Sequence, residues 1–182
     1  MKLKLSNVRL AFPVLHDAKT VNGEGDPAFS ASFLIDPADP QVKTINAAID
    51  QIAKDKWGAK ADAILKQMRA TDKVCLHDGD LKSNYDGFPG NLYISARSKT
   101  RPLVIDTDKT PLVAADGKPY AGCYVNASIE LWPQDNNYGK RVNASLRGVQ
   151  FLRDGDAFAG GGAASADEFD DLGAGAEADA LV

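Results

Sequence analysis

The pair of alternating segments between Cys123 and Phe151 constrains the fold of this chain more than any other feature. In CYVNASIELW, every second side chain from Val125 to Leu131 is apolar and those between are polar, which is typical of a strand with one buried face. After the polar loop PQDNNYG, the segment KRVNASLRGVQFLRDG repeats the alternation as far as Gly148. A bulge at this glycine keeps the later apolar residues on the inward side. The two segments predict paired strands.

Two more strands are expected at the N-terminus. Residues 1–12 alternate with Leu10 and Phe12 inward, and the phase slips near Ser6, which indicates a bulge. A Gly-rich turn leads to a second alternating segment at residues 29–35. The two strands therefore predict a hairpin.

The periodicity then becomes helical. Asp39 before Pro40 marks the start of one helix, and residues 60–69 repeat the apolar spacing of a second. Shorter extended pieces follow later, at residues 103–105 and 111–114. Helices in this position are expected to cover one side of a sheet or barrel.

The pattern predicts a β-rich α+β body of five or more short strands with a helical insertion at about residues 40–69. It fits an OB-fold-like five-stranded barrel and also fits other α+β sheets. We expect a domain over residues 1–156 and a disordered Gly/Ala hinge and acidic C-terminal tail over residues 157–182.

Charge is divided unevenly between these two parts. The chain has 25 acids and 21 bases, and residues 157–182 hold six of the acids and no base. The remaining 19 acids against 21 bases give the body a formal net charge of +2. A slightly basic body with an acidic tail is expected to behave differently from a uniformly acidic protein.

Membrane insertion and secretion are not expected. No segment has the roughly twenty apolar residues needed to cross a bilayer, and the N-terminus lacks the apolar run of a signal peptide. We expect a soluble cytoplasmic protein whose two cysteines, Cys75 and Cys123, are reduced thiols.

The later strands are expected to place aromatic rings and bases outward. These side chains, with two bases just beyond one strand, are Tyr93, Arg97, Lys99, Arg101, Tyr124, Trp132, Arg141 and Arg147. Binding of single-stranded nucleic acid needs this combination, because phosphates attract positive charge and unpaired bases stack on rings. Ordinary solvated strand faces produce the same pattern, so both interpretations stay open.

Two polar loops add further candidates for a DNA-binding surface, namely Tyr85, Phe88, Tyr138 and Lys140. An aromatic loop beside a barrel can clamp a single strand. In the alternative interpretation, Phe88 packs in the core and both loops are simple turns.

The tail contains an acidic segment that also carries two large apolar side chains. Its residues are Asp167, Glu168, Phe169, Asp170, Asp171 and Leu172. Such a peptide offers both charge and a hydrophobic plug to a basic pocket, in a partner or in this protein itself. The alternative is a tail that only increases solubility.

Metal binding and catalysis find little support. Cys75 and His77 supply too few ligands for a zinc site, which needs about four. Asp78 and Asp80 flank a glycine, as in a turn. Phosphate-loop, nucleophile-elbow and dinucleotide motifs are missing from the sequence. We expect no metal, no cofactor and no enzymatic activity.

Several segments together resemble one known family: SASFLIDP, NLYISARSKTRP, YVNASIELWPQDNNYGKRVNASLRGVQFLRDGDAF and the acidic DEFDDL. Over essentially its whole length, the chain is similar to a family of phage proteins first catalogued as a domain of unknown function. Characterised members of that family are single-stranded-DNA-binding proteins with an OB-fold, like the one from the enterobacterial phage Enc34. The part from Tyr124 to Phe158 is the most specific.

The resemblance implies an OB barrel that binds single-stranded DNA without sequence preference, and protects or organises it during phage DNA replication and recombination in the infected cell. It also implies that the acidic tail regulates binding or docks replication or recombination proteins. In many such proteins the acidic cluster ends the chain, whereas here ten residues follow Leu172. The alternative function is that of a structural or protein-interaction barrel of a phage particle.

Overall fold

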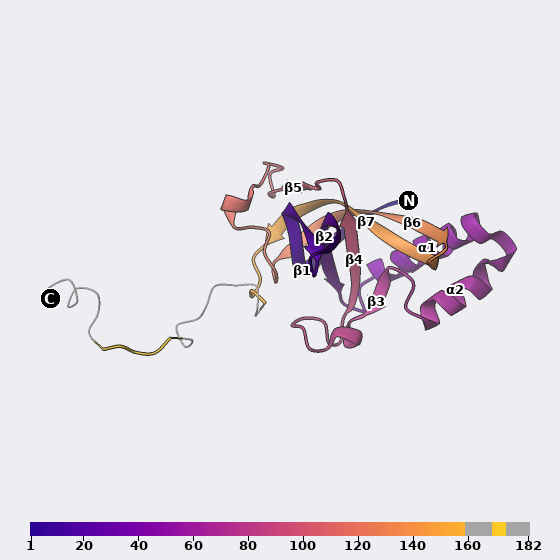
Figure 1. The fold of residues 1–182 in the computed structure, drawn as a ribbon, viewed down its shortest axis with the longest axis horizontal. Coiled ribbons are helices and arrows are strands. Elements are labelled where there is room, and N and C mark those ends of the chain that lie inside the picture. The colour runs from indigo at the N-terminus through magenta and orange to yellow at the C-terminus, as the bar shows by residue number, and fades with distance from the viewer. Residues whose placement is uncertain (159–168, 174–182) are drawn as a thin grey trace.

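The computed structural model describes residues 1–158 and 169–173 (Figure 1). Within these residues the strands are β1 (Lys2–Val21), β2 (Glu24–Ile35), β3 (Leu76–Asp78), β4 (Leu92–Ser98), β5 (Leu103–Ile105), β6 (Tyr124–Asn136) and β7 (Gly139–Arg153). The α-helices are α1 (Gln41–Trp57) and α2 (Ala61–Ala70), and short 3-10 turns are η1 (Gly58–Lys60), η2 (Gly79–Lys82) and η3 (Ala114–Asp116).

Five of the strands close into a barrel. β1 pairs with β2 and β6, β2 pairs with β4, and β6 pairs with β7, all antiparallel. A parallel pairing of Arg97 in β4 with Ser145 in β7 completes the ring. β3 and β5 are additions beside β4 and β7. This connectivity is that of an OB-fold, so the predicted OB-fold-like barrel is confirmed.

The β6–β7 hairpin has the predicted facing of its side chains. Val125 and Ile129 are fully buried in the barrel. In the pairing of β6 with β7, Arg147 has no partner residue on β6, because Ser128 pairs with Gly148 and Ile129 pairs with Leu146. The bulge expected at this point is therefore present. Phe151 is buried as a result, on the same side as the apolar residues before the bulge.

The predicted β1–β2 hairpin is confirmed, with one correction. A register shift confirms the bulge near Ser6. A second shift, between Ala11 and Val14, was not predicted, and there Phe12 has a φ of 48° and is 47% exposed. The prediction that Phe12 points inward is therefore wrong. Pro13 explains the change, because proline has no N–H for the strand ladder and is tolerated at bulges.

The helical insertion is also confirmed, and Figure 1 shows it beside the tip of the β6–β7 hairpin. Ile49 of α1 and Leu65 of α2 join the main hydrophobic core. Trp57 Nε1 donates a hydrogen bond to Asp135 Oδ2 at 2.9 Å, which ties the end of α1 to β6. Among the described residues, no helix has the length and apolar character needed to cross a membrane.

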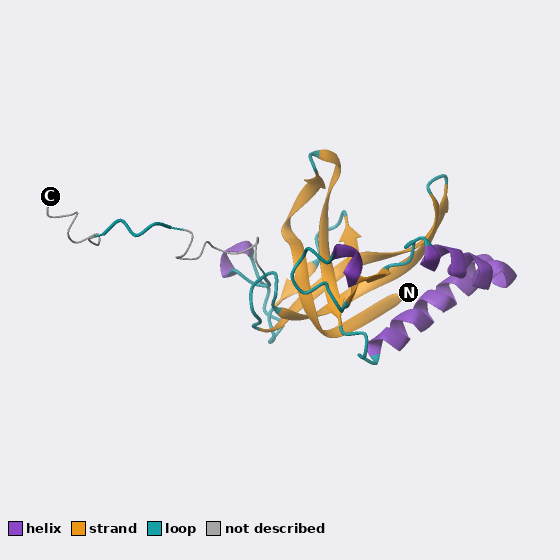
Figure 2. Ribbon diagram, turned by 90° about the horizontal axis from the view of Figure 1, so that it is seen from below, coloured by secondary structure: helices purple, strands orange, loops and turns teal. Residues whose placement is uncertain are grey.

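The shorter extended pieces have different outcomes. Residues 103–105 form β5, as predicted, whereas residues 111–114 contribute only a bridge from Pro111 to Ile105. Figure 2 shows two hairpins that project from the same side of the barrel, one of them beside the helices. The labels in Figure 1 show that the hairpin beside the helices is β6–β7 and that the other is β1–β2. The surface between the two hairpins includes β4.

Candidate nucleic-acid interface

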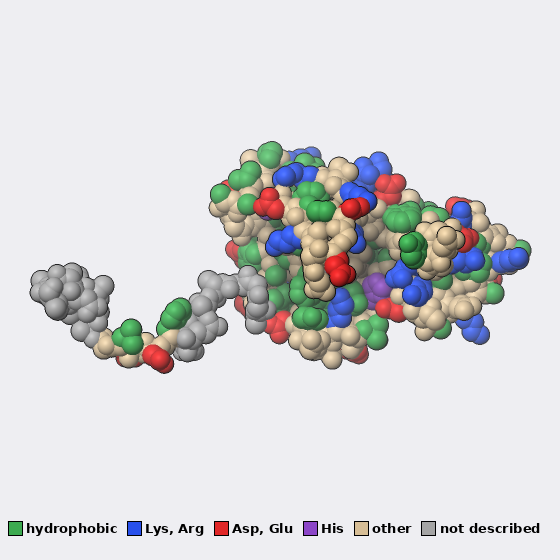
Figure 3. Space-filling view, viewed as in Figure 1, with side chains coloured by type: hydrophobic (Ala, Val, Ile, Leu, Met, Phe, Trp, Pro, Cys, Tyr) green, Lys and Arg blue, Asp and Glu red, His purple; other side chains and the backbone are tan. Residues whose placement is uncertain are grey.

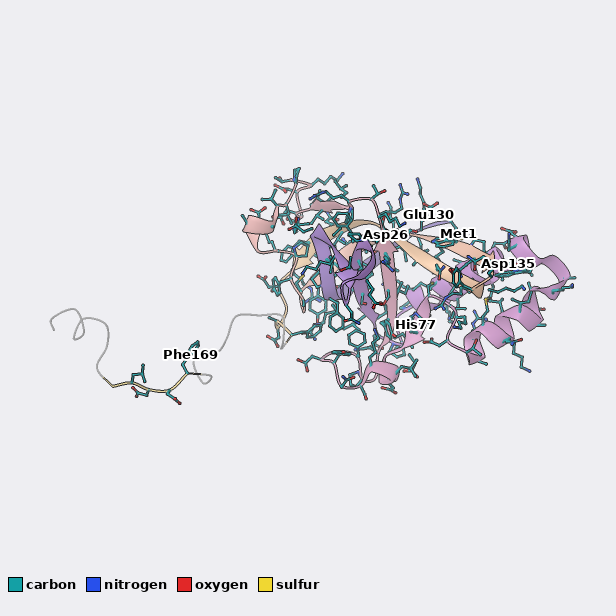
Figure 4. The ribbon with its side chains drawn as sticks, in the orientation of Figure 1. Met1, Asp26, His77, Glu130, Asp135 and Phe169 are labelled. Atoms are coloured by element: carbon teal, nitrogen blue, oxygen red, sulfur yellow. The ribbon has the colours of Figure 1, made fainter. Side chains whose placement is uncertain are left out.

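A groove of about 1170 Å³ lies between β4 and the β6–β7 hairpin, and the start of β2 closes one end. We call it the barrel groove. In Figure 3, lysine and arginine side chains border a hollow on this face of the molecule, and Figure 4 labels Asp26 and His77, two of the residues that line the groove. The charged and aromatic lining residues are Asp26, His77, Arg97, Lys99, Trp132, Tyr138 and Arg141.

Two exposed rings stand on the hairpin side of the barrel groove. Trp132 is 41% exposed, and its Nε1 donates to Ser145 Oγ at 3.0 Å, which fixes the indole against β7. Tyr138, at the tip of the hairpin, is 88% exposed. Large apolar surface of this kind favours contact with another molecule. Because both rings border the same groove, one extended ligand can touch both.

Two arginines in the barrel groove form no salt bridge with the described residues. Within the described residues, Arg97 and Arg141 have no carboxylate oxygen within 4.0 Å of their guanidinium nitrogens. Arg97 Nη2 donates to the backbone carbonyl of Asp26 at 3.3 Å, and the charge of Arg97 helps Lys99 to lower the pKa of the Asp26 carboxyl. A guanidinium without a carboxylate is available to bind an anion such as phosphate.

Lys99 differs because it already has an acidic partner. Its Nζ lies 2.9 Å from Asp26 Oδ2, and this hydrogen bond, together with the charge of Lys99, lowers the pKa of the Asp26 carboxyl. Both side chains are strongly exposed, so the pair is screened by water and contributes little stability. Lys99 can exchange Asp26 for a phosphate at small cost.

A smaller pocket of about 240 Å³ adjoins the barrel groove, and it shares Ser95 and Arg97 with it. We call it the side pocket. Phe12 lines it, and the Phe12 ring meets the ring of Tyr85 edge-on, with centroids 5.0 Å apart. Tyr85 was among the predicted loop residues. Phe12 was missed, although Pro13 in a strand pattern was a signal that the alternation is interrupted there.

Tyr93 and Phe88 do not offer accessible rings. Tyr93 leaves the barrel core, as its alternation predicts, but it is only 4% exposed, so its predicted place on the open surface is wrong. The loop between β3 and β4 covers it: Phe88, fully buried, lies 5.1 Å away between ring centroids. His77 stacks on Tyr93 with centroids 4.9 Å apart. The interpretation of Phe88 as a core residue is confirmed.

Three other predicted residues, Tyr124, Arg147 and Arg101, do not line the barrel groove. Arg153 lies over the Tyr124 ring, with its guanidinium carbon 3.7 Å from the centroid, and Arg147 pairs with Glu130 at 3.0 Å. Arg101 lies over the ring of Phe29, 5.6 Å from the centroid. The barrel groove therefore brings together only part of the predicted set, and DNA binding by Tyr124, Arg101 and Arg147 stays a prediction. Eight residues of strand span about 26 Å, so outward side chains at the two ends of β6 face different parts of a coiled sheet.

Lys140, the remaining loop residue, lies on the other side of the hairpin tip. Its Nζ is 3.7 Å from Asp135 Oδ1, and it lines a different groove from Arg141. Adjacent residues of a strand point to opposite faces, so the two bases serve different surfaces.

Metal ligation and thiol chemistry find no support in the described part of the chain. Residues 1–158 and 169–173 contain no group of three or more His, Cys, Asp or Glu side chains placed to hold a metal ion. Cys75 and Cys123 are free and buried, and burial raises their pKa to about 12 and about 11. Asp78 accepts a hydrogen bond from the Asp80 N–H at 2.9 Å, so these acids build a turn, as predicted.

The acidic tail starts from a fixed point on the body. Phe158 packs against the cluster that contains Phe88, and its N–H donates to the Ala121 carbonyl at 3.1 Å. The Arg9 guanidinium lies 4.4 Å from the centre of the Phe158 ring. A side chain at Gly87, where φ is +82°, would collide with this ring. Phe158 therefore packs on the body, although the predicted tail begins at residue 157.

The predicted tail segment is described only in part. Phe169 and Leu172 are strongly exposed, and Asp171 Oδ1 accepts a hydrogen bond from the Gly173 N–H at 2.8 Å. Figure 4 shows Phe169 well away from the body. Asp167 and Glu168 lie outside the described residues, as do the rest of residues 159–168 and 174–182.

Fold and groove together define an OB-fold protein with a basic, aromatic groove of the kind that holds single-stranded nucleic acid. The family described as "Enterobacter phage Enc34, ssDNA-binding protein" matches residues 1–181, and the chain belongs to this family. The resemblance stated from the sequence is confirmed.

Individual relatives agree with this assignment. "Putative protein p50" of Acyrthosiphon pisum secondary endosymbiont phage 1 is 53% identical over 175 residues, which cover 94% of each chain. The single-stranded DNA-binding protein from bacteriophage Enc34, solved in complex with ssDNA, is 27% identical with a TM-score of 0.71 over 86% of this chain and 88% of that one. The single-stranded DNA-binding protein gp2.5 of bacteriophage T7 shares the fold, with a TM-score of 0.58 and 16% identity over 97% and 98% of the chains.

Proposed function

We propose that this chain binds single-stranded DNA, without sequence preference, in the barrel groove. The observation that carries the proposal is the meeting of two exposed rings, Trp132 and Tyr138, with two arginines that have no carboxylate partner, Arg97 and Arg141. Stacking of a base on a ring contributes about 1 to 3 kcal/mol and works for every base. The guanidinium groups supply the phosphate contacts.

The side pocket extends this surface across β2 and β4. Arg97 and Ser95 line both cavities, and Ser30 lines the side pocket. The two serines are small and let a nucleotide backbone approach closely. Phe12 and Tyr85 supply a second pair of rings at the far side. This is the face on which OB-folds in general bind oligonucleotides. A strand that crosses it passes from Phe12 to Trp132.

The biological role that fits this binding is protection and organisation of single strands during phage DNA replication and recombination, in the cytoplasm of the infected cell. Relatives described as phage ssDNA-binding proteins, one of them solved with ssDNA, support it. The alternative is a barrel that serves protein contacts in a phage particle. Its support is the small positive charge of the body, only +2 by formal count, since many nucleic-acid binders are plainly basic.

A gel-shift competition separates the two functions. We expect the protein to retard single-stranded DNA at low salt, and a sequence-unrelated single strand to compete better than duplex DNA of the same length. RNA in a third lane shows whether the groove distinguishes the sugar. If none of the three nucleic acids is retarded, the DNA-binding function is refuted and the structural barrel is favoured.

We further propose that residues 157–182 form an acidic tail that competes with DNA for the barrel groove or docks replication and recombination proteins. Phe158 fixes the root of the tail against the cluster that contains Phe88 and Tyr93. From Phe158 to Asp167 the chain can span about 30 Å when extended. Tethering at this length gives an effective concentration of roughly millimolar near the root.

Truncation after Phe158 is expected to tighten the binding of single-stranded DNA, most of all at low salt, because six acids that compete with phosphate are removed. This end point keeps the Phe158 ring under Arg9 and so leaves the body intact. Fluorescence anisotropy of a labelled oligonucleotide measures the change.

The matched control keeps the full length and neutralises all six acids of the tail, as in D167N/E168Q/D170N/D171N/E177Q/D179N. If charge is the cause, this variant binds as tightly as the truncated chain. Equal affinity of wild type, truncated and neutralised chains would leave the tail as a docking or solubility element only.

A further inference from the structure

We propose that the DNA-binding surface continues beyond the barrel, around the tip of the β6–β7 hairpin, into a second groove between that tip and α2. This inference rests on the proposed function and names the subsite that longer single strands would use. The second groove has a volume of about 810 Å³. We call it the hairpin–helix groove.

Both walls of the hairpin–helix groove are held in place by contacts within the chain. On one side, Ile64 and Met68 lie on one face of α2, and Lys60 lies just before this helix at the end of η1. On the other side is the hairpin, whose Asp135 accepts the hydrogen bond from Trp57. Figure 4 labels Asp135 at the helical end of the molecule, where this contact bridges α1 and β6. The groove therefore exists before any ligand binds.

Tyr138 connects the two grooves. It is the residue that lines both the barrel groove and the hairpin–helix groove, and its ring is almost fully exposed at the tip between them. A strand stacked on Trp132 reaches Tyr138 as the next ring along the hairpin. Beyond Tyr138 the groove lining includes lysines and the apolar side chains of Trp57, Ile64 and Met68, which suit a sugar–phosphate chain with its bases turned inward.

The charge of the hairpin–helix groove also favours a polyanion. Three lysines line it, Lys60, Lys73 and Lys140, against one acid, Asp135. Asp135 is already engaged by the Trp57 indole and by Lys140, and these contacts lower its pKa. In the described part of the chain, no carboxylate lies within 4.0 Å of the amino groups of Lys60 and Lys73.

An acidic peptide also matches a basic groove with an apolar floor, but continuity favours DNA. Lys73 precedes Val74, which lines the barrel groove, and the Val142 N–H donates to the Lys73 carbonyl at 3.1 Å. The backbone of Lys73 is thus held at the junction of the two grooves. Any strand that is longer than the barrel groove meets it.

The test compares oligo(dT) of about 8 nucleotides, which lies within the usual site size of one OB-fold, with oligo(dT) of about 20 nucleotides, which exceeds it. Lys60→Gln with Lys73→Gln removes two phosphate contacts, each worth about 0.7 in the slope of log K against log salt for single strands, so the slope for the longer strand should fall by about 1.4. The shorter strand should bind as it does to the wild type.

The matched control is Lys54→Gln with Lys66→Gln, which removes the same charge from exposed helix positions that do not line the groove. This control should leave both slopes unchanged. Equal losses on short and long strands, or losses equal to those of the control, would overturn the proposal. Unchanged DNA binding combined with weaker binding of a peptide with the tail sequence would also overturn it and assign the groove to the tail. If the wild type fails to bind even the short strand, the proposed function itself has failed.

Discussion

Replacement of Trp132 by alanine is expected to weaken the binding of single-stranded DNA roughly 5- to 150-fold, which corresponds to the loss of about 1 to 3 kcal/mol of base stacking. The indole is exposed, yet it is held by the hydrogen bond to Ser145, so little ordering is needed when a base stacks on it. Anisotropy titrations with oligo(dT) at constant salt measure the loss. Stability should change little, because the ring is not part of the core.

Tyr124→Leu is the matched control for this prediction. Tyr124 is the other outward ring of β6, but it lies beneath Arg153 and outside the barrel groove. Leucine keeps an apolar side chain under Arg153, and the variant should bind DNA like the wild type. An affinity loss for Tyr124→Leu as large as that for Trp132→Ala would show that the DNA path does not follow the barrel groove.

Phe88→Ala is expected to have the largest effect on stability. The ring is fully buried and contacts Tyr93, Phe12 and Tyr85, with centroids 5.1, 5.7 and 6.1 Å away. Removal of a buried phenylalanine ring costs about 3 to 5 kcal/mol. At about 2 to 4 °C per kcal/mol for a chain of this size, the melting temperature should fall by about 6 to 20 °C.

Tyr85→Ala provides the comparison in the same cluster. Its ring is exposed, so its removal should change the melting temperature by only a few degrees and instead weaken DNA binding at the side pocket. Calorimetry of both variants separates the two roles. A shift below about 2 °C for Phe88→Ala would mean that the loop over Tyr93 is not packed as described.

The sequence predicted the architecture well because strand and helix periods depend on local alternation. The facing of β6 and β7, the bulge beside Gly148 and the helical insertion all followed from apolar spacing and from single Gly or Pro residues. The apolar spacing alone fits an OB-fold barrel and also other α+β sheets. Confirmation of the OB-fold needed the parallel contact of Arg97 with Ser145, a pairing that joins distant parts of the chain.

The site was harder to predict, because an outward direction does not imply exposure or a shared surface. Tyr93 points out of the barrel, yet the loop that carries Phe88 covers it. Tyr124 and Trp132 alternate on the same strand but face different regions, because the sheet coils. Phe12 turned outward at a bulge that only Pro13 signalled. Tertiary covering, coiling and bulges therefore decided which predicted residues came together.

The most direct test of DNA binding in the barrel groove uses Trp132 as its own reporter. The chain has two tryptophans, so Trp57→Phe leaves Trp132 as the single emitter. Because Trp57 lines the hairpin–helix groove, the titration uses oligo(dT) of about 8 nucleotides, which fits the barrel groove alone. At low salt it should quench the fluorescence of Trp132 to saturation, and affinity should fall steeply as salt is added. No binding at low salt, or binding that leaves the emission of Trp132 unchanged, would contradict the assignment of single-stranded DNA to this groove.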